Sequence, residues 1–335
     1  MRSASDVNLV GKTPLMHRIV FLDAATLPTR LRRPSCAHEW IEYPHTAPSE
    51  MIERLCDATI VITNKVALRE EMLARLPALR MIAVAATGTD HIDLDYCRQH
   101  DIVVANIRGY AAHAVPEHAL MMMLALRRQM LAYRADLASG KWQQAAQFCF
   151  FDHPLRDLYG STLGLIGRGS IGQAMGRLGE ALGMRVLWGE RKGVAAAQLR
   201  TGYVTFDTLL AEADILSLHC PLTADTRGLI GAAELDAMKS DAILINTARG
   251  GLVDEAALAT ALREGRIGGA GCDVLSVEPP CDDHPLMAAD LLALPNFILM
   301  PHVGWSSSSA MQILAAQLID NIEAWVRGTP RNLVT

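Results

Sequence analysis

The sequence predicts an α/β protein with two domains, each built on a doubly wound parallel sheet. Its 335 residues are about twice the ~150 residues expected for one domain. Two series of short apolar segments alternate with helix-like stretches. Because these segments are apolar throughout and do not alternate with polar residues, they are typical of parallel strands covered by helices on both faces.

The first series lies in the N-terminal third of the chain, and the second follows residue 160. The predicted strands of the first series occupy residues 17–23, 58–63 and 79–88. The second series comprises residues 161–167, 184–190, 213–220, 242–248, 268–274 and 297–302. Helix-like stretches separate the members of each series, which is the β-α-β pattern.

A long helix is expected between the two series, over residues 116–142, with Pro116 at its start. The methionines at 121–123 face more than one side of such a helix. Because the helix is too apolar to face water, it should be covered by the two domains or by a second subunit. We therefore expect a homodimer.

One more amphipathic helix, at 310–328, should return to complete the first domain. These observations divide the chain into a substrate domain, a cofactor domain and a tail. The substrate domain comprises 17–110 and 304–335, and the cofactor domain comprises 111–303, with the connecting helix at its start. Residues 1–16 are expected to be a disordered tail.

The composition indicates an ordinary soluble protein. Half of the residues are hydrophobic, 20% are charged and the formal net charge is −5, which argues against nucleic acid as a partner. The candidate membrane segment, 119–126, ends at Arg127 and is too short to cross a bilayer. We therefore expect a small-molecule partner and no membrane partner.

The seven cysteines are odd in number and form no C-x-x-C pair, so a disulfide framework or thiolate zinc site is not expected. A reducing cytoplasm is consistent with this pattern. Cys281 and His284 have a C-x-x-H spacing, but they lie in a polar, proline-containing stretch with no second pair of ligands. We assign this stretch to a loop and expect no metal.

A glycine motif follows one predicted strand and precedes a helix-forming run, in the segment LGLIGRGSIGQAMG. Gly167 permits the tight turn, Gly169 permits a pyrophosphate to approach the backbone, and Gly172 permits close helix packing. The helix N-terminus that follows favours phosphate charge. The motif predicts a dinucleotide site, with a plain glycine-rich turn as the alternative.

Glu190 stands 18 residues after Gly172, where an acidic residue would bond the ribose hydroxyls of the dinucleotide. A carboxylate there favours NAD(H), because it would repel the 2′-phosphate of NADP(H). Arg191 and Lys192 follow directly and could pair with that phosphate, so NADP(H) stays open.

Three polar residues follow predicted strands of the second series: Arg249, Glu278 and His302. The carboxyl ends of parallel strands form the ligand crevice of an open α/β sheet, so these side chains are expected to converge there. Taken singly, each has a structural alternative as a salt-bridge group, a loop charge or a hydrogen-bonded histidine.

The sequence around these residues resembles that of the D-isomer-specific 2-hydroxyacid dehydrogenase family. The resemblance rests on LINTARGGLVDEAAL, AGCDVLSVEPP and LPNFILMPHVG and covers about residues 60–330. RGYAAHAVPEHAL and FCFFDHPLRDLYGSTLG point to its glycerate dehydrogenase or hydroxypyruvate reductase branch. The resemblance implies a Rossmann NAD(P)-binding domain inserted in a flavodoxin-like substrate domain.

The family pattern carries the orienting arginine onto Arg249, the acid onto Glu278 and the proton donor onto His302. Reduction of a 2-keto acid needs a proton on the developing alkoxide as hydride arrives, and imidazole suits this task. A neighbouring carboxylate favours imidazolium and fixes the ring. A guanidinium can hold the substrate carboxylate and carbonyl oxygen together.

The same resemblance implies further contacts. Gly88 permits a backbone nest suited to a carboxylate, and the family places substrate binding on Ala86, Thr87 and Gly88, with a plain turn as the alternative. The cofactor contacts it implies, besides the glycine motif, are Ser170, Ile171, Cys220, Pro221, Thr247, Ala248 and Asp273. We add Glu190, Arg191, His302 and Gly304 as further candidate cofactor contacts. Asp273 could equally be a structural cap. Trp305 stands where many members have a small residue, so it should reshape the pocket.

The predicted function is hydride transfer between NAD(P)H and a small 2-keto or 2-hydroxy acid of the D series, best matched by hydroxypyruvate or glyoxylate. One alternative is a regulatory protein that senses NAD(H), as co-repressors of this fold do. Another is the phosphite or formate dehydrogenase branch. Formate enzymes of this fold have glutamine where Glu278 stands, which argues against that branch.

Overall fold

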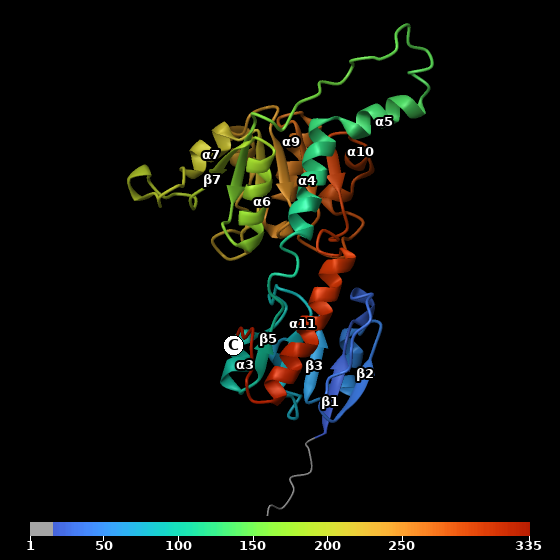
Figure 1. Cartoon of the computed structure of the whole chain (residues 1–335), viewed down its shortest axis with the longest axis vertical. Helices are drawn as coiled ribbons and strands as arrows, with labels where there is room; N and C mark the ends of the chain where they lie inside the picture. The colour runs from blue at the N-terminus through green and yellow to red at the C-terminus, as the bar shows by residue number, and fades with distance from the viewer. Residues whose placement is uncertain (1–15) are drawn as a thin grey trace, which may run out of the picture. The chain divides into compact units, whose positions relative to one another are not determined.

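The computed structural model describes residues 16–335 and divides into two compact units (Figure 1). Unit 1 runs to Tyr110 and resumes over Ser308–Thr335, and unit 2 is Ala111–Ser307. The chain therefore re-enters unit 1 a few residues later than the predicted boundary at 304. The predicted tail lies outside the described residues except for Met16, which is exposed.

Unit 1 has a five-stranded parallel sheet in the order β2-β1-β3-β4-β5. Its strands are β1 (His17–Phe21), β2 (His38–Glu42), β3 (Ile60–Thr63), β4 (Met81–Val84) and β5 (Val103–Ala105). Its helices are α1 (Met51–Leu55), α2 (Glu70–Leu73), α3 (Leu94–Gln99) and α11 (Ser308–Val326). The order 2-1-3-4-5 is that of flavodoxin-like folds.

The sequence analysis missed two strands of this sheet. The edge strand β2 is only partly buried and has polar residues within it, so it lacks the continuous apolar run that identified the others. The strand β5 is three residues long. Each becomes a strand by pairing with a buried neighbour, β2 with β1 and β5 with β4. Such pairing is a tertiary contact, which a local sequence pattern does not show.

Unit 2 has a six-stranded parallel sheet in the order β11-β10-β9-β8-β6-β7. Its strands are β6 (Thr162–Ile166), β7 (Arg185–Trp188), β8 (Ile215–Leu218), β9 (Ile243–Asn246), β10 (Gly269–Cys272) and β11 (Phe297–Leu299). Its helices are α4 (Ala114–Arg127), α5 (Met130–Ala138), α6 (Ser170–Ala181), α7 (Phe206–Glu212), α8 (Ala232–Ala237), α9 (Glu255–Arg263) and α10 (Ala289–Leu292). The strand order reverses at β6, which places a ligand crevice at its carboxyl end.

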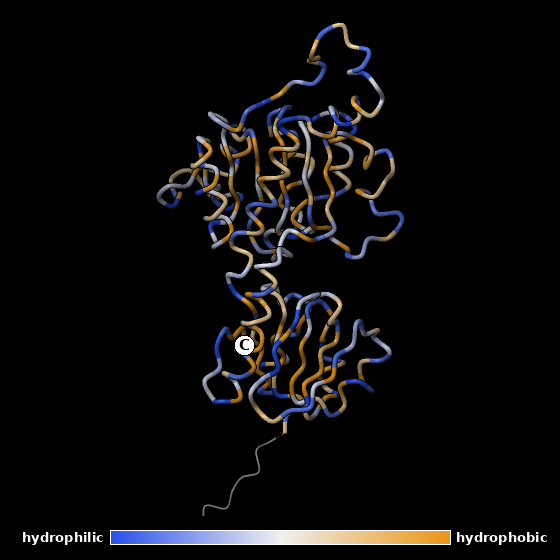
Figure 2. Tube along the Cα trace, turned by 45° about the vertical axis from the view of Figure 1, so that its right-hand side comes forward, coloured by the Kyte–Doolittle hydropathy of each residue, from blue (hydrophilic) through white to orange (hydrophobic). Residues whose placement is uncertain are grey.

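Hydrophobic strands form the core of each unit, and Figure 2 shows them as orange stretches whose ends run into more hydrophilic turns. Every residue of β3, β4, β6, β8, β9 and β10 is buried. Because buried strand backbone is paired on both sides, the turns at the carboxyl ends are where polar side chains can face a ligand.

The predicted connecting helix is two helices. The first, α4, ends at Arg127, and Gln129 has φ 52° before α5 begins. Met122 and Met123 are fully buried within unit 2 against Leu163 and its neighbours. In Figure 1, α4 and α6 lie side by side on one face of the sheet. Two of the three methionines therefore need no second subunit to cover them, whereas Met121 stays 40% exposed.

Helix α11 is tied to unit 1 by polar contacts as well as by its apolar face. Asn321 donates to the backbone oxygen of Asn106 at 2.9 Å, and Arg32 bonds Asp320 and Glu323. The Arg32 guanidinium lowers the pKa of Glu323 to about 2. These contacts join segments more than 200 residues apart in sequence and explain why the chain returns to this unit.

Candidate functional site

The glycine motif forms the turn between β6 and α6. Gly167 has φ 101°, and a Cβ there would lie 2.4 Å from the carbonyl oxygen of His219. A Cβ on Gly172 would lie 2.0 Å from the carbonyl oxygen of Gly167. A Cβ on Gly169 would have no neighbour within 4 Å. The first and third glycines are therefore needed by the turn itself, while the middle one leaves open space.

That open space lies at the start of α6, whose first residues are Ser170 and Ile171. The first backbone N–H groups of a helix have no partner within the helix and attract phosphate. At the end of β9, the buried Oγ1 of Thr247 has no hydrogen-bond partner among residues 16–335. A bare glycine, a helix N-terminus and an unpartnered hydroxyl are consistent with a bound dinucleotide.

Glu190 follows β7 and is buried, with 4% exposure. Arg200 holds both of its oxygens, from Nε at 2.6 Å and from Nη2 at 2.7 Å. This bidentate contact lowers the pKa of Glu190 to about 2, so the carboxylate is ionised at neutral pH. Lys192 bonds Glu234 at 2.6 Å instead of facing this site. The sequence analysis did not identify Arg200.

Two predicted site residues meet beyond the ends of β10 and β11. His302 Nδ1 lies 2.6 Å from Glu278 Oε2, and the side chains are 23% and 33% exposed. The second oxygen, Glu278 Oε1, accepts from the backbone N–H of Leu275 at 2.9 Å. Because Nδ1 faces the carboxylate, Nε2 is the ring nitrogen left to exchange a proton with a ligand.

The backbone at His302 has φ 55°, so neighbouring contacts must hold it. Asp273 does so by accepting from the backbone N–H groups of Val303 at 2.9 Å and Gly304 at 2.8 Å. Trp305 Nε1 donates to the backbone oxygen of His302 at 3.0 Å. Asp273 therefore acts as a cap of this loop, and Trp305 helps to fasten the loop through its indole N–H.

Arg249 follows β9, and the side chain of Asn246 fixes the turn before it. Asn246 Nδ2 donates to the backbone oxygen of Arg249 at 2.9 Å, and Asn246 Oδ1 accepts from the N–H of Ala248 at 3.1 Å. The Arg249 guanidinium donates to the oxygen of Ala248 at 2.7 Å. Arg249 thus leaves the same edge of the sheet as Glu278 and His302.

Cys220 and Pro221 follow β8 at this edge. Cys220 is partly buried, and burial raises the pKa of its thiol to about 11, so it is neutral at physiological pH. Pro221 is exposed. These residues belong to the loop after the strand that neighbours the glycine turn. The Arg191 side chain is exposed beside Glu190.

In unit 1, Ala86, Thr87 and Gly88 follow β4. The carbonyl of Ala86 accepts from Ile107, the carbonyl of Thr87 accepts from Asn106, and the Thr87 hydroxyl donates to the oxygen of Ile107. Within residues 16–335, no internal hydrogen bond uses the N–H of Thr87 or Gly88. Two such N–H groups in a turn suit a carboxylate.

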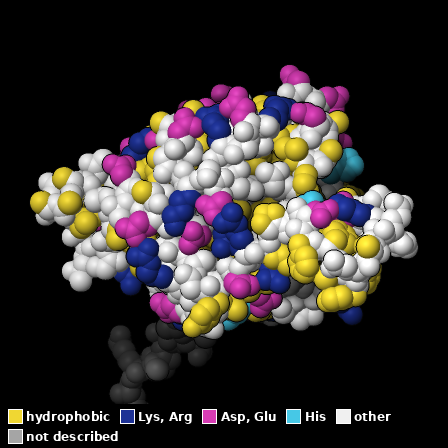
Figure 3. All heavy atoms as spheres, turned by 90° about the horizontal axis from the view of Figure 1, so that it is seen from above, with side chains coloured by type: hydrophobic (Ala, Val, Ile, Leu, Met, Phe, Trp, Pro, Cys, Tyr) yellow, Lys and Arg dark blue, Asp and Glu magenta, His cyan; other side chains and the backbone are white. Residues whose placement is uncertain are grey.

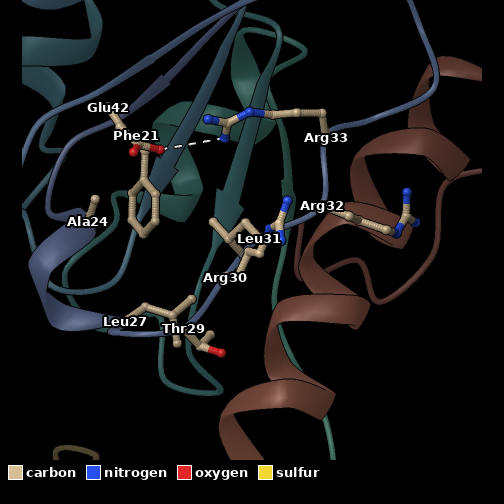
Figure 4. Close-up of a pocket in the computed structure, with 9 residues that line it drawn as sticks. All are labelled: Phe21, Ala24, Leu27, Thr29, Arg30, Leu31, Arg32, Arg33 and Glu42. Carbon is tan, nitrogen blue, oxygen red and sulfur yellow. Dashed lines mark hydrogen bonds and ion pairs between the residues drawn. The ribbon is translucent and has the colours of Figure 1, made fainter.

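A cavity of about 640 Å³ also lies in unit 1, at the carboxyl ends of β1 and β2 (Figure 4). Its lining is Phe21, Ala24, Leu27, Thr29, Arg30, Leu31, Arg32, Arg33 and Glu42. Arg33 pairs with Glu42 and stacks on Trp40, and Arg32 is held by α11. None of the predicted site residues lines this cavity.

Among residues 16–335 there is no group of three or more His, Cys, Asp or Glu side chains placed to hold a metal ion. In the same part of the chain, no helix combines the length and apolar character needed to span a bilayer.

Comparisons with known proteins agree with the geometry. Residues 120–304 match the family model of the D-isomer specific 2-hydroxyacid dehydrogenase NAD-binding domain. The chain is 49% identical to a glycerate dehydrogenase of Methylorubrum extorquens over 95% of this chain and 98% of that one. It is 35% identical to a hydroxypyruvate reductase of Blautia hydrogenotrophica over 88% and 92% of the two chains. A solved D-lactate dehydrogenase of Aquifex aeolicus, complexed with NAD and lactic acid, aligns with a TM-score of 0.76 at 28% identity, over 93% of this chain and 96% of that one.

The glycine turn yields a paired prediction. Gly169→Ala should leave the thermal unfolding midpoint unchanged, because its Cβ meets nothing in the protein, yet it should weaken NADH binding about tenfold or more by obstructing the pyrophosphate. Gly172→Ala should lower the midpoint itself. Calorimetry and NADH fluorescence titration measure the two effects. Equal NADH affinity in Gly169→Ala and the parent would remove the pyrophosphate from this turn.

Proposed function

Because the chain belongs to the D-isomer specific 2-hydroxyacid dehydrogenase family, we propose that it reduces hydroxypyruvate or glyoxylate with NADH. It is an NAD-dependent oxidoreductase that acts on the CH–OH group of a 2-hydroxy acid. The observation that carries the proposed chemistry is the 2.6 Å contact between His302 and Glu278, at the same edge of the sheet as the glycine turn. The names of the two similar enzymes above support the choice of substrates.

Each residue has a defined task in this proposal. The bound nicotinamide supplies the hydride. His302 donates a proton from Nε2 to the oxygen of the keto group, while Glu278 fixes the orientation of the ring through Nδ1. Arg249 binds the substrate carboxylate with a planar, permanently charged group. In unit 1, the N–H groups of Thr87 and Gly88 are proposed as a second place suited to a carboxylate.

The alternatives are not favoured. A protein that only senses NAD(H) has no need of an imidazole held by a carboxylate at this edge of the sheet, and the curated relatives are named as dehydrogenases and reductases. The formate branch is disfavoured by Glu278, whose negative charge directly faces His302.

For the cofactor, we propose that NADH is preferred and that Arg200 moderates the preference. Glu190 keeps its negative charge, which opposes a 2′-phosphate. Arg200 places a positive charge against the same carboxylate, so it offsets part of that repulsion. The preference therefore depends on the pair and not on Glu190 alone.

We also propose that the protein forms a homodimer through an arm of unit 2 made of α5 and the segment up to residue 160, which Figure 1 draws extending from the sheet. Phe148 is 88% exposed and Phe151 is 81% exposed. Figure 3 looks onto the end of unit 2 that carries this arm, where hydrophobic side chains lie among charged ones. Further exposed apolar residues of α4 and the arm are Met121, Leu124, Met130, Leu137, Trp142, Leu155 and Tyr159.

A reducing cytoplasmic location is proposed from the cysteines. All seven lie within residues 16–335, and each is a free thiol there. Burial raises the pKa of Cys97 to about 11 and of Cys272 to about 12, so these thiols are neutral and unreactive.

The first prediction of this proposal concerns turnover. His302→Ala should slow NADH-dependent reduction of hydroxypyruvate and glyoxylate roughly a hundredfold or more, and Arg249→Lys should raise KM and lower kcat. Steady-state loss of NADH absorbance measures both, with the exposed His45→Ala as the matched control. Full activity in His302→Ala would overturn the assignment of the proton donor.

Cofactor preference gives a second prediction. Arg200→Ala should increase the ratio of kcat/KM for NADH over NADPH, and Glu190→Ser should decrease it, because the two changes remove charges of opposite sign. Both ratios come from the same assay. A parent enzyme that prefers NADPH tenfold or more would contradict the proposal.

The arm gives a third prediction. The parent should have about twice the 36.4 kDa mass of one chain in light scattering, and Phe148→Ser combined with Phe151→Ser should shift it toward one chain. Leu292→Ser, at an exposed apolar residue outside the arm, is the control. A parent that is monomeric at micromolar concentration would rule out the dimer.

A further inference from the structure

The loop after β10 carries Glu278 and has a second anchor that the proposed reaction does not use. Within the loop, Leu275 N–H donates to Glu278 Oε1 at 2.9 Å. Ser276, two residues before Glu278, is bonded through both its backbone and its side chain to Glu255. The conformation that turns Glu278 toward His302 is therefore fixed from outside the loop as well as from within it.

Glu255 is the first residue of α9 and is a buried carboxylate, with 8% exposure. Its Oε1 accepts from Ser276 N at 2.7 Å, and its Oε2 accepts from Ser276 Oγ and from His284 Nε2, the latter at 2.9 Å. Three donors thus converge on one charge. A buried carboxylate is costly unless it is fully hydrogen-bonded. Moving any one of the three donors away would therefore cost free energy, which keeps all three in place.

The tautomer of His284 follows from its two contacts. Leu286 N–H donates to Nδ1 at 3.2 Å, so Nδ1 carries no proton. Nε2 then carries the proton and donates it to Glu255. The His284 side chain is only 4% exposed, so solvent does not compete for this bond. The histidine that the sequence analysis placed in a metal-free loop is the third donor of a buried network.

The loop that carries Glu278 also touches the segment that carries Arg249. A Cβ on Gly250 would lie 1.9 Å from the carbonyl carbon of Leu275, so only glycine permits this approach. Gly250 follows Arg249 directly, and Glu255 lies five positions after Gly250. The Glu255 carboxylate therefore joins the segment that follows Arg249 to the loop that carries Glu278, and each of these segments carries a residue of the proposed reaction.

We propose that Glu255, Ser276 and His284 form a clamp that positions Glu278 against His302, with Glu255 as its key positioning residue. The proposal rests on the role given above to Glu278 and His302. A clamp that served only folding would affect stability and would act independently of Glu278. A positioning clamp acts through Glu278, and this difference can be measured.

The test uses Glu255→Gln in the full-length protein. The new amide group must face at least one of the three donors, because all of them point at the two oxygens of Glu255. Reduction of hydroxypyruvate should lose roughly ten- to hundredfold in kcat, while the Kd for NADH changes by less than about twofold. Glu264→Gln, the same change at the exposed C-terminal end of α9, should behave as the parent does.

A double-mutant cycle with Glu278→Gln then separates positioning from stability. In the Glu278→Gln background, Glu255→Gln should cost less than about twofold in kcat, because the group it positions is already gone. The same fold-loss in both backgrounds, or an unchanged kcat in Glu255→Gln alone, would overturn the clamp. If Glu278→Gln itself reduces keto acids normally, the role of Glu278 fails first.

Ser276→Ala is a milder substitution for the same double-mutant cycle. It removes one donor and keeps the backbone bond to Glu255, so the protein should fold even if Glu255→Gln does not. Its kcat should fall several-fold in the parent and stay level in Glu278→Gln. Equal losses in the two backgrounds would again overturn the proposal.

Discussion

The site depends on one contact, between the imidazole of His302 and the carboxylate of Glu278. Both residues lie in loops, and a loop has no regular hydrogen-bond pattern to fix a side chain to within a few tenths of an ångström. The contact therefore requires that neighbouring groups hold each loop. Two buried carboxylates of unit 2, those of Asp273 and Glu255, do this.

Two buried carboxylates divide the task. Asp273 holds the His302 loop by two backbone N–H bonds, and Glu255 holds the Glu278 loop through Ser276 and His284. Each carboxylate is met by hydrogen-bond donors, and His118 Nε2 also lies 3.3 Å from Asp273 Oδ1. Charge-assisted bonds of this kind are short and directional, which suits a task of orientation.

The sequence predicted the sheets and the reacting groups better than the groups that support them. Apolar strands and the glycine turn are local patterns, and Arg249, Glu278 and His302 lie in recognisable motifs. The partner of a buried charge is not a local property: Arg200 is 10 residues from Glu190, whereas His284 is 29 residues from Glu255. The short strands β2 and β5, and the helix break at Gln129, likewise depend on tertiary contacts that no local pattern encodes.

The turnover of Glu278→Gln tests the central claim most directly. The Glu278 carboxylate fixes the His302 ring through its contact with Nδ1, so kcat for the reduction of hydroxypyruvate should fall roughly ten- to a hundredfold without it. The Kd for NADH should change by less than about twofold. A kcat equal to that of the parent, in a folded variant that binds NADH normally, would contradict the account.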